Sequence, residues 1–207
     1  MSKVDSEARR AHREFLNRYY GISRHFYDPT RKYYLFGRDR VLDQLLCEDW
    51  SRLLEIGVGT GRNLEILHRR RPEAHYAGLD ACDAMLAHTR RRLPWLHTLH
   101  GYAEDADLCA PFAGQRPDRV LISYCLSMLE DPLAAIDNAQ RALAPGGKLL
   151  FVDFADLETL PGPAARALRR WLRWFHVEPL ETPWLEQTGA RLRYGPMRYF
   201  VIGELAP

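Results

Sequence analysis

The sequence predicts an α/β protein in which a seven-stranded, mostly parallel sheet is covered by helices on both faces. Short apolar runs alternate along the chain with segments of helical periodicity, which is typical of parallel strands joined by helical crossovers. The first apolar run breaks into a loop with glycines at alternate positions, Gly57, Gly59 and Gly61. The last two predicted strands, joined at Gly195-Pro196, lie too close for a helical crossover and predict an antiparallel hairpin.

The expected elements follow one another in that alternation. Strands are expected at residues 52–56, 75–79, 97–100, 118–123, 147–154, 190–195 and 198–204. Helices are expected near 6–19 and at 38–47, 61–70, 83–92, 132–143 and 163–175. Proline lacks the amide hydrogen that a helix interior needs, so it favours the ends of elements. Four prolines stand at such ends: Pro72, Pro94, Pro132 and Pro145.

Length and composition indicate one folding unit. A chain of 207 residues, 46% of them hydrophobic, can bury a complete core. We expect residues 1–40 to form an N-terminal helical lid on a domain spanning residues 41–207. No apolar run approaches the roughly 20 residues needed to span a bilayer, and the N-terminus is too polar for a signal peptide. We therefore expect a cytoplasmic protein, in contact with membrane only as a peripheral protein at the inner surface.

The cysteines and histidines predict no metal site. The four cysteines, Cys47, Cys82, Cys109 and Cys125, are widely separated and form no C-x-x-C pair. They predict neither zinc binding nor a disulfide framework, and they indicate a reducing compartment. The histidines show no ligand spacing, so no metal is expected.

Positive charge gathers in two parts of the chain. Residues 1–40 carry ten Lys or Arg against five Asp or Glu. In the second part, the expected helix 163–175, Leu168, Trp171, Leu172 and Phe175 share one face at helical spacing. Its arginines, Arg166, Arg169, Arg170 and Arg173, lie largely on the other face. Two interpretations stay open: a cover helix over the substrate pocket, and contact with an anionic membrane surface.

Two acids flank the glycine loop in sequence. Glu55 precedes it, and Asp80 ends the next apolar run, 19 residues after Gly61. Glycine lets a ligand lie directly against the backbone. The Gly57-x-Gly59-x-Gly61 spacing departs from the dinucleotide pattern, and Glu55 would repel a pyrophosphate. Glu55 would instead attract a net cationic nucleoside such as S-adenosylmethionine, and Asp80 suits its ribose diol.

These residues resemble the class I S-adenosylmethionine-dependent methyltransferases, whose fold is Rossmann-like. The resemblance continues through residues 80–86, 118–124 and 143–152 and covers about residues 40–155. It implies a cofactor site made of Glu55, Gly57, Gly59, Gly61, Asn63, Asp80, Ala81, Met85, Ala103, Glu104 and Ser123, together with Tyr27, Tyr33 and Arg38 of the lid. Where many relatives have Gly-Asp-Ala, this chain has Gly101-Tyr102-Ala103 followed by Glu104 and Asp105. Which acid contacts the adenine amino group is therefore open.

The segment 24–40 resembles particular members of that family. Its Tyr-Asp and Gly-Arg pairs look like those of bacterial betaine-lipid enzymes, which N-methylate diacylglyceryl homoserine, and more loosely like ubiquinone and menaquinone C-methyltransferases. An arginine, Arg31 or Arg38, suits the carboxylate of such a headgroup, and Tyr124 is expected beside the substrate. Cofactor carboxylate contact and core packing stay open as alternative roles for the lid arginines and tyrosines.

Methyl transfer needs alignment more than a strong base. An amine must be neutral when it attacks, so Tyr27, Tyr124 and His176 are the candidate proton acceptors. We expect an N-methyltransferase of a lipid-linked homoserine. The alternatives are methylation of a quinone or another small molecule, and a binding protein that performs no chemistry. We expect no nucleic-acid partner, and the sequence leaves the oligomeric state open.

Overall fold

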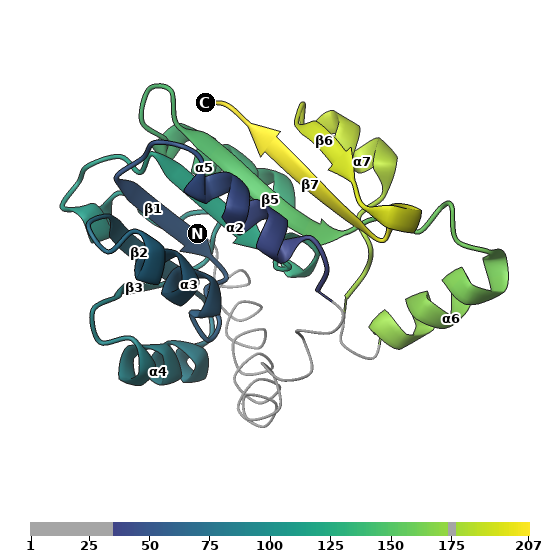
Figure 1. The fold of residues 1–207 in the computed structure, drawn as a ribbon, viewed down its shortest axis with the longest axis horizontal. Coiled ribbons are helices and arrows are strands. Elements are labelled where there is room, and N and C mark those ends of the chain that lie inside the picture. Colours follow the sequence, from purple (N-terminus) through teal and green to yellow (C-terminus); the bar gives the residue numbers. More distant parts are fainter. Residues whose placement is uncertain (1–34, 174–176) are drawn as a thin grey trace, which may run out of the picture.

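A seven-stranded sheet with the order β3-β2-β1-β4-β5-β7-β6 forms the centre of the molecule (Figure 1). The computed structural model describes residues 35–173 and 177–207. The strands from β3 to β5 pair in parallel, and β7 runs antiparallel to both of its neighbours, β5 and β6. The predicted fold, including the antiparallel hairpin at the C-terminal end, is confirmed.

The observed elements match the predicted ones closely. The strands are β1 (Arg52–Ile56), β2 (His75–Asp80), β3 (His97–His100), β4 (Arg119–Ser123), β5 (Lys148–Phe154), β6 (Arg191–Tyr194) and β7 (Phe200–Leu205). The helices are α2 (Arg38–Leu46), α3 (Arg62–Arg70), α4 (Asp83–Arg92), α5 (Pro132–Ala142), α6 (Gly162–Arg173) and α7 (Thr182–Gln187). Short 3-10 helices span Ala110–Phe112, Leu126–Met128 and Pro196–Arg198. The helix expected near 6–19 lies outside the described residues.

Helix α7 was not predicted from the sequence. It has six residues, fewer than two turns, so no helical periodicity can be recognised in it. The domain boundary expected after residue 40 falls inside α2, which begins at Arg38. Leu35 and Val41, on the two sides of that boundary, both join the same core cluster.

The core is divided between the two faces of the sheet, and successive strand residues alternate between them. On β5, Leu150 and Val152 face one cluster, whereas Leu149 and Phe151 face the other. Alternation is expected because neighbouring side chains of a strand point to opposite faces. Helices α2, α3 and α6 contribute to the first cluster, and α5 and α7 to the second.

Helix α6 lies against the first cluster by the face that its sequence predicted. Leu172 is buried, and Leu168 and Trp171 are half-buried against the core. Arg169 donates a hydrogen bond to the backbone oxygen of Asp156. Phe175, assigned to the same face, lies outside the described residues. No helix within the described ranges is long and apolar enough to cross a membrane.

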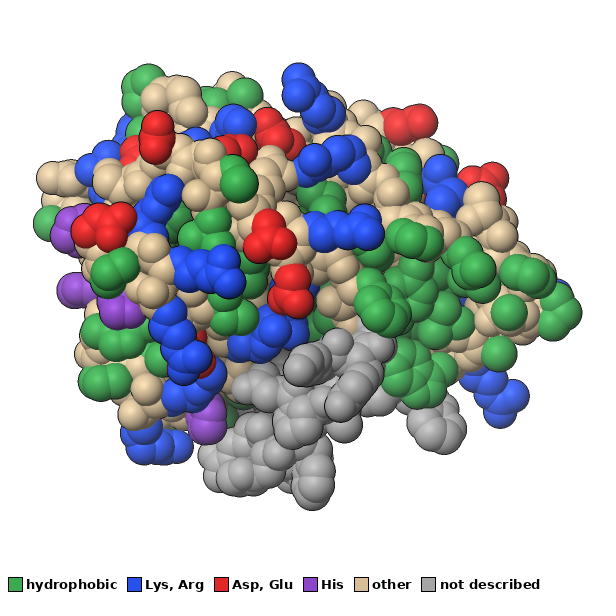
Figure 2. Space-filling model, viewed as in Figure 1, with side chains coloured by type: hydrophobic (Ala, Val, Ile, Leu, Met, Phe, Trp, Pro, Cys, Tyr) green, Lys and Arg blue, Asp and Glu red, His purple; other side chains and the backbone are tan. Residues whose placement is uncertain are grey.

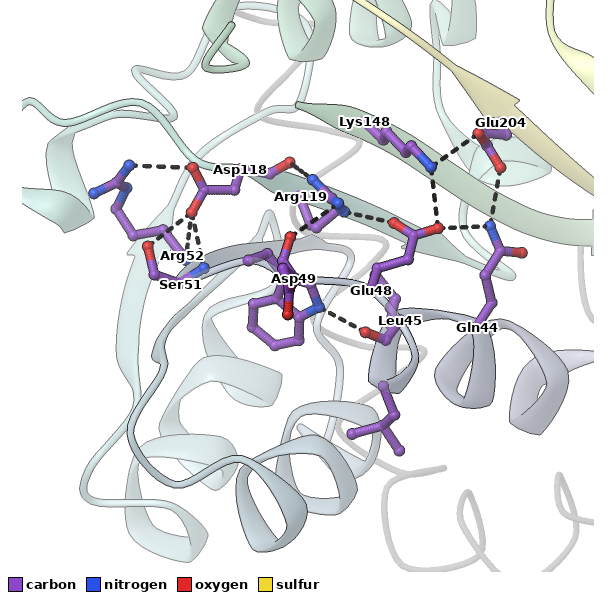
Figure 3. A network of polar contacts seen from close by, with 12 residues as sticks. Gln44, Leu45, Glu48, Asp49, Ser51, Arg52, Asp118, Arg119, Lys148 and Glu204 are labelled. Atoms are coloured by element: carbon purple, nitrogen blue, oxygen red, sulfur yellow. Dashed lines mark hydrogen bonds and ion pairs between the residues drawn. The ribbon is translucent and has the colours of Figure 1, made fainter. Parts of the chain in front are cut away.

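A network of charges joins the amino ends of the strands to α2 (Figure 3). Glu48 accepts hydrogen bonds from Arg119 Nε at 2.9 Å and from Lys148 Nζ at 3.1 Å. Lys148 Nζ also lies 3.3 Å from a carboxylate oxygen of Glu204. Burial raises the pKa of Glu48, but the hydrogen bonds from Lys148 and Gln44 and the charge of Arg119 outweigh it, so that its pKa is lowered overall.

Asp118 has a similar role at the start of β4. Its Oδ2 accepts hydrogen bonds from the backbone nitrogens of Ser51 and Arg52, both at 2.9 Å. Burial opposes the charge of Asp118, yet these bonds prevail and lower its pKa. Glu48 and Asp118 are therefore both paired within the protein.

Candidate active site

A cavity lies at the opposite, carboxyl ends of β1, β2 and β4. The chain continues from β1 toward β2 on one side of the sheet, and β4 pairs with the other side of β1. Such a reversal of strand order leaves a crevice where ligands bind in open α/β sheets. Eleven residues named from the sequence line this cavity: Arg38, Glu55, Gly57, Gly59, Asn63, Asp80, Ala81, Met85, Ala103, Ser123 and Tyr124.

The glycine loop folds tightly because its glycines adopt left-handed backbone angles. The φ angles are 70° at Gly57, 52° at Gly59 and 76° at Gly61. A Cβ on Gly57 would lie 2.3 Å from the sulfur of Cys125, so only glycine fits there. Gly61 faces Leu93, away from the cavity, and precedes α3. Its role is therefore in packing, whereas Gly57 and Gly59 line the cavity.

Glu55 is buried near the end of β1, with 2% of its surface exposed. Its Oε1 accepts a hydrogen bond of 2.6 Å from Asn63 Nδ2, in the first turn of α3. Its Oε2 and the Oδ1 of Asn63 have no partner among the described residues. Burial raises the pKa of Glu55 to about 8. The sequence predicted an anion at the mouth of the loop; the structure instead shows an enclosed carboxyl group that holds its proton near neutral pH.

Asp80 connects the glycine loop to the start of α4. One of its carboxylate oxygens accepts from the backbone nitrogen of Gly59 at 2.8 Å, and the other from that of Cys82 at 2.9 Å. Burial raises the pKa of Asp80, opposed by those backbone bonds. Since each carboxylate oxygen has two lone pairs, both can still accept a ligand hydroxyl.

The segment after β3 forms another wall. Asn138 Nδ2 donates to the backbone oxygen of Ala103 at 2.9 Å and fixes the segment to α5. Glu104 Oε1 accepts from the backbone nitrogen of Asp131 at 3.3 Å, and its Oε2 is buried without a partner among the described residues. The neighbouring acid, Asp105, is exposed. Neither acid lines the cavity, but Glu104 is less exposed than Asp105 and directly follows Ala103, which does line it.

Ser123 and Tyr124 end β4 at the cavity. Ser123 Oγ is buried and has no partner within the described part of the chain. The hydroxyl of Tyr124 donates to the backbone oxygen of Phe36. Burial raises the pKa of Tyr124, and its ring meets Phe154 edge-on at 4.8 Å. We therefore revise the assignment of Tyr124 as a proton acceptor: the residue connects the cavity wall to the segment before α2.

The pKa of the Cys125 thiol depends on the acids around the cavity. Burial raises the pKa of its thiol well above the ordinary value, and four carboxylates raise it further: Asp80, Asp153, Glu104 and Glu55. A thiolate is disfavoured where the local potential is negative. Asp80 and Glu130 line the cavity together with Arg38 and Arg62, so charges of both signs are available to a ligand.

The donor groups of S-adenosylmethionine fit these observations. Glu55 Oε2, Asn63 Oδ1 and Ser123 Oγ are buried oxygens that can accept hydrogen bonds, and leaving such atoms unpaired is costly. An ammonium group, ribose hydroxyls and an adenine amino group supply the donors that they lack. Glu55 would lose its proton beside such a cation.

Several functional residues were not predicted, and others lie outside the described residues. Leu35, Thr60, Arg62, Cys82, Cys125, Met128, Leu129 and Glu130 also line the cavity. Most belong to connecting segments without periodicity; Arg62 and Cys82 had a usable signal, because each adjoins a residue assigned to the site. Tyr27, Arg31, Tyr33 and His176 fall outside the described ranges.

Comparison with known proteins identifies the family. A family model described as a methyltransferase domain matches residues 24–189. The chain therefore belongs to the methyltransferase domain family. The solved structures with similar folds include an S-adenosylmethionine-dependent methyltransferase from Aquifex aeolicus, with a TM-score of 0.62, 18% identity, and coverage of 89% of this chain and 96% of that one. Another is DesVI from Streptomyces venezuelae, with a TM-score of 0.63, 19% identity, and coverage of 90% and 97%.

Curated relatives differ in their acceptors. A trans-aconitate 2-methyltransferase from Methylobacterium nodulans is 36% identical over 58% of this chain and 43% of its own length. A demethylmenaquinone methyltransferase from Thermus thermophilus is 31% identical over 62% of this chain and 60% of its own length. A malonyl-[acyl-carrier protein] O-methyltransferase from Halorhodospira halophila is 32% identical over 74% of this chain and 52% of its own length. The chain thus spans about half the length of these relatives.

Proposed function

We propose that the protein binds S-adenosylmethionine in this cavity and catalyses transfer of its methyl group to a small acceptor. The observation that carries the proposal is the set of unpartnered acceptor atoms on Glu55, Asn63 and Ser123 beside the Asp80 carboxylate. When bound, the cofactor would supply an electrophilic methyl group to the nucleophile, with S-adenosylhomocysteine as the other product.

Each wall of the cavity has a separate part in binding. Glu55 and Asn63 hold the amino group of the methionine moiety, and Asp80 accepts from the ribose hydroxyls. Glu104, whose Oε2 has no partner among the described residues, accepts from the adenine amino group. Met85 and Met128 supply apolar surface. Together these contacts fix the orientation of the reacting carbon, which is the main source of rate in such a displacement.

Enclosure and proton removal complete the mechanism. The Tyr124–Phe36 hydrogen bond holds the segment before α2 over the cavity and helps to exclude water. Tyr27 and His176 remain the candidate proton acceptors, since the Tyr124 hydroxyl is already engaged as a donor. With an amine acceptor, the proton leaves the nitrogen before the attack, and the new nitrogen–carbon bond replaces the lost hydrogen.

The acceptor that we propose is the amino group of diacylglyceryl homoserine, methylated successively to the trimethyl betaine lipid. The similarity of residues 24–40 to betaine-lipid enzymes supports this choice. Arg38 lines the cavity, where its guanidinium suits the headgroup carboxylate. Phe36 is 54% exposed beside it and offers apolar surface to an acyl chain.

Contact with a lipid surface would bring that acceptor to the cavity. Helix α6 exposes Arg166, Arg170 and Arg173. Figure 2 shows hydrophobic side chains gathered toward α6, whereas charges of both signs are interspersed over α2 and α3. We therefore propose peripheral membrane contact through the outer face of α6. Because its apolar face packs inward, attraction to anionic headgroups, roughly 1 kcal/mol per arginine, would supply most of the binding.

Two experiments test these proposals. The purified protein is incubated with S-adenosylmethionine and the amino lipid, and mono-, di- and trimethyl products are scored by mass. Demethylmenaquinone and trans-aconitate run in parallel, since relatives bear those names. Methylated lipid supports the proposal, and turnover of only another acceptor contradicts it. Cofactor binding without turnover of any acceptor would favour a non-catalytic binding protein.

For the membrane contact, cosedimentation with phosphatidylglycerol vesicles compares two charge-matched double variants. Arg170→Glu with Arg173→Glu changes the proposed surface, and Arg70→Glu with Arg91→Glu changes exposed arginines of α3 and α4. Loss of vesicle binding only in the α6 variant is expected. Equal behaviour of the two variants would contradict a role for α6.

A further inference from the structure

The segment after β4 touches both halves of the cavity. Cys125 packs against the glycine loop so closely that a Cβ on Gly57 would lie 2.3 Å from its sulfur. Three residues later, Met128 packs against the cluster formed by Cys82 and Met85 at the start of α4. Any displacement of residues 124–128 would therefore disturb the glycine loop and the end of β2 together.

This segment begins with an unfavourable backbone conformation. Tyr124 has a φ of 53°, in the left-handed region that residues with a Cβ seldom adopt. Such conformations cost about 1 to 3 kcal/mol and persist only where the surroundings impose them. The backbone nitrogen of Tyr124 donates to the oxygen of Val152 at 2.7 Å, and that of Met128 donates to the oxygen of Cys125 at 3.0 Å, but neither bond involves Ser127.

Asp153 supplies the missing support from the adjacent strand, β5. Its carboxylate is fully buried. One oxygen accepts from Ser127 Oγ at 2.9 Å and from the backbone nitrogen of Phe154 at 2.8 Å, and the other accepts from the backbone nitrogen of Ser127 at 3.0 Å. Two of these three bonds hold Ser127, which lies between Cys125 and Met128.

Stability alone does not account for this aspartate. Burial raises the pKa of Asp153 to about 6, and no cation of the described residues forms an ion pair with it. Burying a carboxylate without a counter-charge costs free energy. Asp156, three residues later, differs: Arg198 Nε donates to it at 2.8 Å, and this hydrogen bond lowers its pKa to about 2.

We propose that Asp153 is a positioning residue for the cofactor cavity, acting through Ser127 to hold Cys125 and Met128 against the glycine loop and the start of α4. The inference rests on the proposed function, because the cavity that it shapes is the cofactor site. It assigns an affinity role to a side chain that does not line the cavity.

The test measures binding of S-adenosylhomocysteine by calorimetry, at a temperature at which circular dichroism shows each variant to be folded. Asp153→Asn places an amide nitrogen among donors, and we expect affinity to fall about tenfold or more. Ser127→Ala removes only the hydroxyl bond, for an expected loss of roughly three- to tenfold. Ser127→Thr keeps the hydroxyl and should restore affinity to within about twofold. Asp156→Asn is the matched control and should also stay within about twofold.

The outcomes separate this inference from the proposed function. Affinity that is unchanged in both Asp153→Asn and Ser127→Ala would overturn it, as would an equal loss in Asp156→Asn, which would mean general destabilisation. If Asp153→Asn does not fold, the Ser127→Ala and Ser127→Thr pair decides alone. A wild-type protein that binds no S-adenosylhomocysteine would instead contradict the cofactor assignment itself.

Discussion

The pKa values of acids are shifted in opposite directions at the two ends of the sheet. At the amino ends of the strands, Glu48 and Asp118 are satisfied by cations and backbone amides, and their pKa values are lowered. At the carboxyl ends, burial raises the pKa values of Glu55, Asp80 and Asp153. Glu48 and Asp118 are only partly buried, whereas Glu55 and Asp153 are buried, so the difference lies in burial as well as in the partners that the chain provides.

This contrast separates acids that stabilise the fold from acids that serve a ligand. The first kind finds its counter-charge within the protein and favours folding in the charged form. The second kind is buried with acceptor capacity left over, at some expense of stability, and completes its interactions when a ligand arrives. Changes at the two ends should therefore have opposite effects on stability and on binding.

The largest effect is expected from Glu55→Gln on the pH dependence of stability. The native state holds the Glu55 proton up to about pH 8, whereas the unfolded chain releases it near 4.5. Native protein thus binds more protons in that window, and stability falls as the pH rises through it, by an amount on the order of 5 kcal/mol at most. Glutamine removes this dependence. Urea unfolding of both proteins at several pH values between 5 and 8.5 checks it, and parallel curves would contradict it.

The next effect concerns Glu48→Ala at the other end of the sheet. The substitution leaves the guanidinium of Arg119 buried without its carboxylate, so unfolding free energy should fall by about 3 kcal/mol. Affinity for S-adenosylhomocysteine should not change. Glu73→Ala, which breaks only a long and exposed pair, is the control and should cost less than about 0.5 kcal/mol. A large loss of affinity in Glu48→Ala would contradict the proposed difference between the acids at the two ends of the sheet.

Asp80→Ala should show the reverse pattern. Loss of the carboxylate removes the ribose contact and frees the backbone nitrogens of Gly59 and Cys82. Calorimetry should show S-adenosylhomocysteine binding weakened tenfold or more, about 1.4 kcal/mol. Stability should fall by less than in Glu48→Ala, because burial opposes the charge of Asp80. Unchanged affinity would remove Asp80 from the cofactor site.

The smallest expected effect is a change in the preference for adenine over hypoxanthine in the ligand, caused by Glu104→Gln. A carboxylate accepts from the adenine amino group but repels the oxygen of hypoxanthine, whereas a glutamine amide can donate to that oxygen. The preference for S-adenosylhomocysteine over S-inosylhomocysteine should narrow by roughly three- to tenfold. Asp105→Asn is the matched control and should keep the wild-type preference. A change in the control alone would assign the contact to Asp105.

The order of the elements and the principal site residues could be predicted from the sequence. Strand and helix periods are local properties of the chain, and the glycines of the loop indicate backbone angles that residues with a side chain seldom adopt. Glu55 and Asp80 were identified from their positions, because Glu55 precedes the glycine loop and Asp80 ends the next apolar run. Helix α7 was missed because six residues are too few to establish a period.

The protonation of these acids and the support of the cavity were decided by tertiary structure. Glu55 looks like an anion in sequence, but burial, only partly opposed by the hydrogen bond from Asn63, raises its pKa to about 8. The sequence made Tyr124 a candidate proton acceptor, but its hydroxyl donates a hydrogen bond to the backbone oxygen of Phe36, 88 residues away in sequence. Asp153 could not be assigned a role from the sequence, because its partner Ser127 lies on another strand connection. Sequence thus determined the types of group available, whereas packing over long separations determined their charge and their partners, since both depend on what surrounds each atom in space.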